Sequence, residues 1–594
     1  MPAKFAIGID LGTTNSVLAY TALGEELSQV KVLPIPQLVA PSTVEPHDML
    51  PSFLYLGTEA EASAGSLDLP WSHEADYAVG AMAHKQAADT PTRTVVAAKS
   101  WLAYPKVDRR QPILPWGAPP EVKKVSPVEA STRYLKHLIA AWEAAFPDAP
   151  FAEQEVVLTV PASFDPSARD LTREAALKAG FPEQFILLEE PQAALYAWLS
   201  DMGDNWRKQL KVGDTLLVCD VGGGTTDFTL IGVAEEHGEL MLRRIAVGNH
   251  TLVGGDNMDL TLAHFARTAF AEKGHDLNPW QSVALWHSCR LAKESLLGEN
   301  PPQKHPVTIL GRGTKLIGGT VSVDLDRDAI SKVLLEGFLP ACELTDKPAK
   351  RRASGFREIG LPFETDTAIT RHLAAFLTAN APDGDAARPT DILFNGGVFK
   401  APALRQRLID VMSQWFPKQP PKLLEGRHDL DFAVARGAAY YGAAKRGKGV
   451  RIRGGAPRSY YVGIETAGLA IPGAPRPLRA LCVVPFGMEE GTEIDVPSEP
   501  IGLVVGEPTN FAFLSSATRK HDRPGDMLDF WQETELVETD PIQANLPAAE
   551  GAEDNYVPVH FKSRITELGV FELWCVSDVS PQQWKLEFSV REEE

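Results

Sequence analysis

The sequence predicts an α/β fold of two similar lobes, followed by a small all-β sandwich domain. The first observation behind this prediction is a strand, a Gly/Thr turn and a second strand that occur twice, at residues 5–20 and 216–232. The second is that helical and strand patterns alternate after each copy, up to about residue 445. The third is a change beyond residue 460 to short strands separated by turns, which is typical of an all-β domain.

The two hairpin turns have the composition of phosphate-binding loops. The first copy reads I-G-I-D-L-G-T-T-N-S and the second reads L-L-V-C-D-V-G-G-G-T-T-D. In each copy a strand ends in an aspartate, Asp10 or Asp220, and the turn that follows is rich in backbone N–H groups and hydroxyls. One such turn is more often a plain hairpin, but the matched pair favours a nucleotide site. We interpret it as an internal duplication in which lobes 1–210 and 211–445 each present one hairpin to a shared cleft.

Composition bounds the environment and the partners. A chain of 594 residues is long enough for three or four domains, and a formal net charge of −20 argues against a nucleic-acid binder. The five cysteines include no C-x-x-C pair, which fits a reducing compartment better than a disulfide framework or a zinc site. No segment resembles a signal peptide, and no apolar run approaches the roughly 20 residues that span a bilayer. We therefore expect a cytoplasmic protein with no nucleic-acid partner and no membrane partner.

In the first lobe, spacing and start signals predict the elements in order. Residues 37–51 lack helical spacing and are expected to form loop or edge structure, whereas 126–146 begin with Ser-Pro and carry apolar residues on one helical face. The other expected elements are helices at 81–104, 167–179 and 191–199 and strands at 155–161 and 186–189.

In the second lobe, helices follow the second hairpin and surround one buried strand. The motif at 247–259 is expected to lead into a helix that ends near residue 273. The other expected elements are helices at 279–297, 326–339, 366–378, 402–416 and 431–444, a hairpin at 307–323 and a short strand at 391–394. Residues 345–363 are basic and then bear Gly and Pro, so we expect a surface insertion there.

The chain beyond the second lobe begins with a basic, Gly-rich stretch at 446–459, which is typical of a linker between domains. The acidic, proline-bearing stretch 536–555 is expected to be a loop, and no helical bundle is expected after the last strand. Strands are expected at 460–464, 480–484, 502–505, 510–514, 556–561, 570–576 and 584–590.

Polar and Gly-rich positions at the predicted strand ends complete the expected cleft. Asp10 and Asp220 would place two carboxylates near the phosphates and would suit Mg²⁺ held through water. Glu190 follows a strand and fits equally a charge at a helix N-terminus or a group that orients an attacking water. Asp431 alone fits a helix cap better than a ligand contact. The remaining candidates are Gly254 and Gly255 beside a phosphate, and Gly396 and Gly397 beside a nucleoside.

These motifs resemble the heat-shock protein 70 (DnaK) family within the actin-like ATPase superfamily. The resemblance covers about residues 5–445 in order and is weaker beyond 460, where S-Y-Y-V-G-I-E-T and G-V-F-E-L-W-C-V-S are similar to strands of that family's peptide-binding β-sandwich. Besides the two hairpins, the matching motifs are V-V-L-T-V-P-A-S-F-D-P-S-A-R, L-L-E-E-P-Q-A-A, V-G-G-D-N-M-D, F-N-G-G and D-F-A-V-A-R-G-A-A.

The resemblance implies ATP or ADP with Mg²⁺ as ligands, and roles for individual residues. Glu190 would handle the catalytic water, while Pro161 and Arg169 would relay the nucleotide state to the peptide domain. The first phosphate loop would contain Asp10, Gly12, Thr13, Thr14 and Asn15; the second Gly222, Gly223, Gly224 and Thr225; the metal site Asp10, Asp220 and Asp227; and the adenosine side Lys293, Gly396, Gly397 and Asp431.

The sequence departs from the family pattern at three places. The family's catalytic lysine falls on His84, with Lys85 one position beyond, and a neutral imidazole is a weaker phosphate partner than an ammonium. Around Lys293 most adenosine-contacting positions differ. The family's linker is an acidic-tipped leucine run, whereas Ile452 here alternates with basic residues.

Three hypotheses of function follow. The first is an ATP-driven chaperone, a weak ATPase that couples hydrolysis to the grip on unfolded or extended peptide segments, with J-domain and nucleotide-exchange proteins as the co-chaperones that the resemblance implies. The second is a nucleotide-sensing clamp or co-chaperone that binds ATP with little hydrolysis. The third is an actin-like structural filament. We favour the first, with the second close behind it on mechanism.

Overall fold

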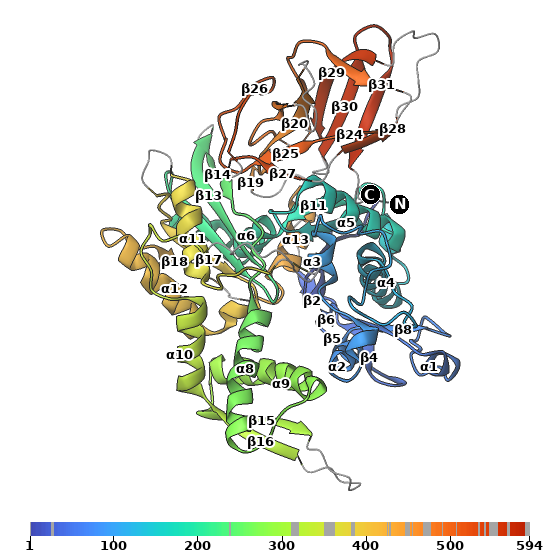
Figure 1. The fold of residues 1–594 in the computed structure, drawn as a ribbon, viewed down its shortest axis with the longest axis vertical. Coiled ribbons are helices and arrows are strands. Elements are labelled where there is room, and N and C mark those ends of the chain that lie inside the picture. The colour runs from blue at the N-terminus through green and yellow to red at the C-terminus, as the bar shows by residue number, and fades with distance from the viewer. Residues whose placement is uncertain are drawn as a thin grey trace.

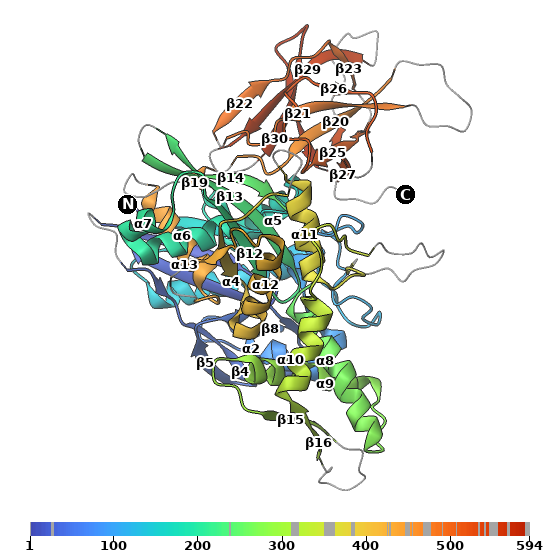
Figure 2. The same ribbon diagram turned by 90° about the vertical axis from the view of Figure 1, so that its left-hand side faces the viewer.

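The computed structural model describes most of the chain. The described residues are 2–24, 29–236, 239–310, 320–349, 361, 363–381, 386–424, 426, 429–445, 452–453, 455–466, 477–489, 491–505, 508–532, 535–539, 542–545, 556–566 and 571–588. Most of the expected insertion at 345–363 and half of the expected linker at 446–459 therefore lie outside the described residues. Figures 1 and 2 show the N-terminal α/β part with the C-terminal β region, residues 459–588, at one end of it.

The first of two mixed sheets begins with the first predicted hairpin. Strand β1 pairs antiparallel with β2 and parallel with β10. The sheet has the order β11-β10-β1-β2-β3, and β6 also pairs with β2. Its strands are β1 Phe5–Leu11, β2 Asn15–Ala22, β3 Lys31–Val32, β6 Leu50–Pro51, β10 Glu155–Val160 and β11 Ile186–Glu189.

The second sheet repeats the same pairing around the second hairpin. Strand β12 pairs antiparallel with β13 and parallel with β17, as β1 pairs with β2 and β10. The order is β18-β17-β12-β13-β14-β19. Its strands are β12 Thr215–Val221, β13 Thr226–Glu236, β14 Glu239–Val247, β17 Asp391–Asn395, β18 Lys422–Leu423 and β19 Ile452–Arg453. The shared pairing places Asp10 and Asp220 at equivalent positions, one residue before the last of β1 and of β12.

Two helices, α6 (Glu190–Met202) and α13 (Ala433–Ala444), pack between the two sheets. One hydrophobic cluster joins both helices to residues of both sheets, including Leu188, Leu216 and Val434. The helices approach so closely that a Cβ at Gly437 would lie 1.7 Å from the Ala193 carbonyl oxygen. The small residues of A-R-G-A-A-Y-Y-G-A-A therefore bring the two sheets together.

The outer faces of both sheets carry further helices. Helices α4 (Pro127–Ala145) and α5 (Pro166–Ala179) cover the first sheet. The second sheet is covered by α8 Gly255–Glu272, α9 Pro279–Leu297, α10 Arg327–Phe338, α11 Ile369–Ala379 and α12 Pro402–Trp415, with the hairpin of β15 Lys304–Leu310 and β16 Thr320–Asp326. A smaller attachment packs beside the first sheet. Residues 37–51 were expected to form loop or edge structure, but β4 and β5 pair as a separate two-stranded sheet. The elements of the attachment are β4 Ile35–Ala40, β5 Thr43–His47, β7 Leu54–Leu56, α1 Glu59–Ser63, β8 Tyr77–Val79, α2 Ala81–Asp89, β9 Thr94–Val95 and α3 Ala98–Leu102. Helix α7 (Trp206–Gln209) follows α6.

The C-terminal β region contains two sheets that share one hydrophobic core. The expected strand at 510–514 is divided between them, because β24 ends at Phe511 and β25 begins at Phe513. The expected loop at 536–555 contains two short strands. One sheet of this region contains β20 Ser459–Glu465, β21 Leu478–Val484, β25 Phe513–Ser516, β26 Met527–Leu528 and β27 Val537–Glu538. The other sheet of this region contains β22 Thr492–Asp495, β23 Ile501–Val504, β24 Pro508–Phe511, β28 Ile542–Asn545, β29 Tyr556–Ile565, β30 Phe571–Ser577 and β31 Gln583–Phe588.

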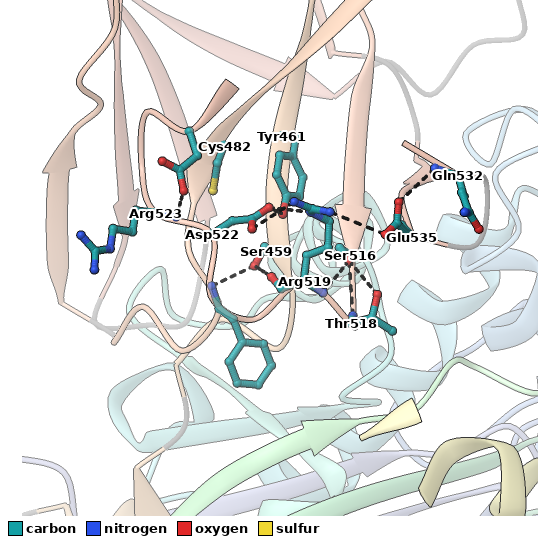
Figure 3. A network of polar contacts seen from close by, with 12 residues as sticks. Ser459, Tyr461, Cys482, Ser516, Thr518, Arg519, Asp522, Arg523, Gln532 and Glu535 are labelled. Carbon is teal, nitrogen blue, oxygen red and sulfur yellow. Dashed lines mark hydrogen bonds and ion pairs between the residues drawn. The ribbon is translucent and has the colours of Figure 1, made fainter. Parts of the chain in front are cut away.

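A polar network fixes the loop between β25 and β26 (Figure 3). The Tyr461 hydroxyl donates to Asp522, which also accepts a hydrogen bond from Arg519 at 2.7 Å. Ser516 accepts from the backbone N–H of Arg519. Held in this way, the loop extends Lys520 to the Ile245 carbonyl at the end of β14, and the C-terminal β region contacts the second sheet there.

His137 on α4 gives the fold a predicted pH dependence. Its Nε2 lies 2.9 Å from the Pro36 carbonyl oxygen, and burial lowers its pKa from 6.5 to about 4 although that hydrogen bond opposes the shift. Between those pH values the unfolded chain binds a proton that the folded chain does not, so stability falls as pH falls. We expect His137→Gln, which cannot titrate, to lose about 2 kcal/mol less stability than the unmodified chain between pH 7 and pH 5. Urea unfolding at both pH values measures this difference, and an equal loss in the two chains would contradict it.

Among the described residues, none of the helices is both long and apolar enough to cross a membrane.

Candidate nucleotide-binding site

The two hairpin turns meet each other. A Cβ at Gly223 would lie 2.0 Å from Thr14 Oγ1, and one at Gly224 would lie 3.1 Å from Thr13 Cγ2. The N-terminus of α8 is tied to the same place, because the Asp256 N–H donates to the Gly223 carbonyl at 2.7 Å. Glycine at 223 therefore leaves room for Thr14, and the two turns lie together with the N-terminus of α8.

A cleft of about 910 Å³ opens where the turns meet, which is large enough for a nucleotide. Residues of both sheets and of α8, α9 and α12 line it. The predicted site residues that line it are Asp10, Gly12, Thr13, Thr14, Asn15, His84, Glu190, Asp220, Gly222, Gly223, Thr225, Asp227, Gly255, Lys293, Gly396, Gly397 and Asp431. Gly224 and Gly254 lie behind the lining, against the hairpins.

At the end of the cleft formed by the two hairpin turns, several carboxyl groups lie around the ammonium of Lys99. Glu190 forms an ion pair with Lys99, and both side chains are about nine-tenths buried. Burial raises the pKa of Asp10 to about 7 and that of Asp220 to about 8, and the charge of Glu190 adds to both shifts. Burial alone would lower the pKa of Lys99, but Glu190 and Asp10 raise it. The lysine is therefore charged, whereas burial and the nearby Glu190 favour the protonated forms of Asp10 and Asp220.

Lys99 lines the cleft, although the sequence motifs had indicated Lys85 as the lysine of the site. Lys85 points to the surface, where its ammonium donates to the Val39 carbonyl at 2.9 Å, and it does not line the cleft. The prediction for Lys85 is corrected accordingly. A signal for Lys99 was present, because it is the one charged residue in T-V-V-A-A-K-S-W-L-A, and a lone ammonium in an apolar run is typical of a buried functional cation.

His84 lines the cleft as a neutral aromatic residue. Its ring packs against Phe53 at 4.5 Å and His287 at 5.7 Å between centroids. Burial, aided by the positive charge of Arg290, lowers the pKa of His84 to about 4. At neutral pH it is therefore the neutral imidazole that the sequence predicted, and the Lys99 ammonium supplies a positive charge elsewhere in the cleft.

At the other end of the cleft, two of the predicted adenosine residues, Lys293 and Asp431, each form an ion pair. Lys293 lies 2.7 Å from Asp259, and Lys400 forms an ion pair with Asp431. Gly396 has φ +85°, and a Cβ there would lie 2.7 Å from Asp220 Oδ1. No other residue fits this turn between β17 and α12.

The donor set fits a hydrated divalent cation. Among the described residues, no three Asp, Glu, His or Cys side chains come close enough to ligate one ion directly. Mg²⁺ commonly keeps several waters and binds through few carboxylates plus phosphate oxygens. The raised pKa values of Asp10 and Asp220 show that these buried carboxyls lack a compensating positive charge, which a bound cation would supply. Asp227 lies at the edge of this group, where Ser163 donates to it at 2.5 Å and His250 lies 3.3 Å away.

The two predicted relay residues do not line the cleft and lie at the ends of β10 and β11. Pro161 is buried directly after β10. Arg169 donates to the buried Glu189 at 2.8 Å, and Glu189 also pairs with Arg244 of β14. Arg244 in turn donates to the Gly455 carbonyl, so a chain of contacts runs from the residue before Glu190 to the expected linker, just before the C-terminal β region.

Comparison with known proteins identifies the matched part of the chain. A family model described as "Hsp70 protein" matches residues 70–301, a segment that contains Lys99, Glu190 and the second hairpin. The chaperone protein HscA homolog of Acinetobacter baumannii is 27% identical over 369 residues, which cover 60% of this chain and 51% of that protein. The HscA homolog of Actinobacillus pleuropneumoniae is 33% identical over 44% of this chain and 37% of its own length. HscA of Xenorhabdus nematophila is 31% identical over 44% of this chain and 38% of its own length. The chain thus spans about half, or less, of the curated relatives that it matches.

The match to the Hsp70 model implies an actin-like ATPase fold, and ATP and ADP are the ligands that this family implies for the cleft. Residues 70–301 are similar to the Hsp70 family, and the relatives that the chain matches are named as chaperones.

Proposed function

We propose that the chain is an ATP-dependent molecular chaperone of the Hsp70 type. ATP binding and hydrolysis in the cleft would control how the C-terminal β region binds unfolded or extended peptide segments. In this proposal the two sheets and their helices are two lobes around the nucleotide, and the C-terminal β region is a peptide-binding sandwich. The observation that carries the proposal is the Lys99–Glu190 ion pair beside Asp10 and Asp220, in the cleft where both hairpin turns meet.

The cleft residues divide the work of hydrolysis among them. Backbone N–H groups of both turns and the Thr13 and Thr225 hydroxyls bind phosphate oxygens. Glu190 accepts a hydrogen bond from the attacking water and orients it toward the terminal phosphate. The Lys99 ammonium stabilises negative charge on the oxygens as the bond breaks. Asp10 and Asp220 would hold Mg²⁺ through water, and the ion neutralises phosphate charge when bound.

Contacts between the C-terminal β region and the α/β part support coupling between the two. Strand β19, within the expected linker, pairs in parallel with β14 at Leu242 and Arg243. Arg244 on the same strand joins Gly455 to Glu189, the neighbour of Glu190. A change at Glu190 would therefore have a short polar path through Glu189 and Arg244 to the linker that precedes the peptide-binding region. J-domain and exchange proteins are the partners that we propose for this cycle.

The proposal predicts separable effects on binding and hydrolysis. We expect Glu190→Ala to lower single-turnover ATP hydrolysis by about 10²–10⁴-fold, because it removes the group that orients water. Affinity for ATP should change little, since the phosphate-binding turns remain. Calorimetric titration of Mg-ATP and Mg-ADP, paired with single-turnover hydrolysis on the same sample, measures both quantities.

A matched control and the alternative complete this test. Glu183→Ala removes an exposed carboxylate just before β11, the strand that Glu190 follows. The rate of ATP hydrolysis should remain unchanged in this variant. Binding without turnover in the unmodified chain would favour the nucleotide-sensing clamp over the ATPase. That alternative began from His84 at the lysine position, and the buried Lys99 supports the ATPase instead. Absence of ATP and ADP binding would contradict both.

A further inference from the structure

Asn395, at the end of β17, supports a cleft carboxylate from the adjacent strand. It pairs in register with Asp220, and its side chain is 3% exposed. Its Nδ2 donates to Asp220 Oδ2 at 2.7 Å. The amide nitrogen is the only donor of an asparagine side chain, so the hydrogen bond to the carboxylate fixes the amide orientation. The other end of the amide, Oδ1, must then point elsewhere.

The Oδ1 atom of Asn395 has no hydrogen-bond partner among the residues that the structure describes, although it is buried and the residue lines the cleft. Asp259 Oδ1 is the other buried oxygen of the cleft lining without such a partner, but the Lys293 ammonium lies 2.7 Å from it. Buried polar atoms in folded proteins are almost always satisfied, so an unpaired acceptor in a ligand cleft indicates a donor supplied by the ligand.

We propose that Asn395 positions the divalent cation of the bound nucleotide. Its amide nitrogen holds Asp220, and its carbonyl oxygen accepts a hydrogen bond from a water molecule of the hydrated cation. Phosphate oxygens are acceptors and cannot satisfy Oδ1, whereas water bound to a cation presents its hydrogens outward. This inference rests on the proposed nucleotide function and deepens it, because it assigns a residue outside the predicted site list to the cation.

The nucleotide itself offers other donors, namely the ribose hydroxyls and the base amino group. A contact with one of these would strengthen nucleotide binding whether or not the cation is present. A contact through cation-bound water would matter only when the cation is present. The dependence of the effect on the cation therefore separates the two.

The test measures Mn²⁺ binding by electron paramagnetic resonance in the presence of ADP, together with ADP binding in EDTA. We expect Asn395→Leu, which keeps the shape but removes both polar atoms, to weaken Mn²⁺ binding by about 10–100-fold. ADP affinity in EDTA should change by less than about threefold. Should the leucine variant fail to fold, Asn395→Ala gives the same comparison with a smaller side chain.

Ser498→Ala is the matched control. Ser498 also carries a buried side-chain oxygen without a hydrogen-bond partner, but it lies in the C-terminal β region, and its removal should leave Mn²⁺ binding unchanged. Unchanged Mn²⁺ affinity in the Asn395 variants would overturn the inference, as would an equal loss of ADP affinity with and without the cation. In both cases ADP binding by the unmodified chain would keep the proposed function, whereas no ADP binding by that chain would overturn both.

Discussion

Replacing Lys99 with methionine should lower the rate of ATP hydrolysis by about 10²–10³-fold, the effect of removing one preorganised group that stabilises transition-state charge. Lys99 is the ammonium in contact with Glu190, and methionine keeps much of its length and apolar stem. Single-turnover hydrolysis at saturating Mg-ATP measures the effect on the chemical step. Lys85→Met is the matched control and should leave the rate within about twofold, since Lys85 donates to a surface carbonyl outside the cleft.

Two further outcomes of this comparison are informative. Lys99→Arg keeps the positive charge in a different shape and should retain more activity than Lys99→Met. A large loss in Lys85→Met with full activity in Lys99→Met would contradict the assignment and restore the lysine position taken from the sequence. Because Lys99→Met leaves Glu190 buried without its ion-pair partner, thermal unfolding of each variant must accompany the rates.

The difference between Lys85 and Lys99 shows what a local pattern can predict here. The two hairpins were predictable because strand, aspartate and Gly/Thr turn are neighbours in the chain, and their backbone geometry is local. The position of Lys99 depends instead on where β9 and α3 are placed against the cleft. The resemblance to the family placed the expected lysine at residues 84–85, on α2. Only the packing of these elements reveals that Lys99 is the lysine that reaches Glu190.

Other contacts between residues far apart in the chain were also not predictable from local sequence patterns. Asn395 was part of the predicted strand-to-turn motif, but its role depends on registry with Asp220, 175 residues away. The sequence around Glu189 did not predict its ion pair, because its partner Arg244 lies 55 residues away in the chain. In the C-terminal β region, an apolar run predicted one strand at 510–514, but the structure divides it between two sheets, a choice that tertiary packing makes.

The Arg244 contact leads to the second large prediction, which concerns the attachment of the C-terminal β region. Arg244 is 4% exposed and joins the Glu189 carboxylate to the Gly455 carbonyl. Arg244→Met would leave both acceptors without this donor, and breaking a buried ion pair costs about 3 kcal/mol or more. We expect the region to separate from β14 more often, so that trypsin cleaves the basic stretch 446–459 at least roughly tenfold faster.

The neighbouring residue on the same strand offers a matched control. Arg243 is exposed, and its backbone pairs with Arg453 of β19 in the unmodified chain. Arg243→Met removes the same charge but should leave the cleavage rate unchanged, so a rate increase in both variants would indicate a general loss of charge on β14. Equal cleavage of Arg244→Met and the unmodified chain would show that β19 pairing and the Lys520 contact hold the region without Arg244. Because Glu189 adjoins Glu190, a variant that releases the region should also change the rate of ATP hydrolysis, and a variant that changes only one of the two would argue against a common path.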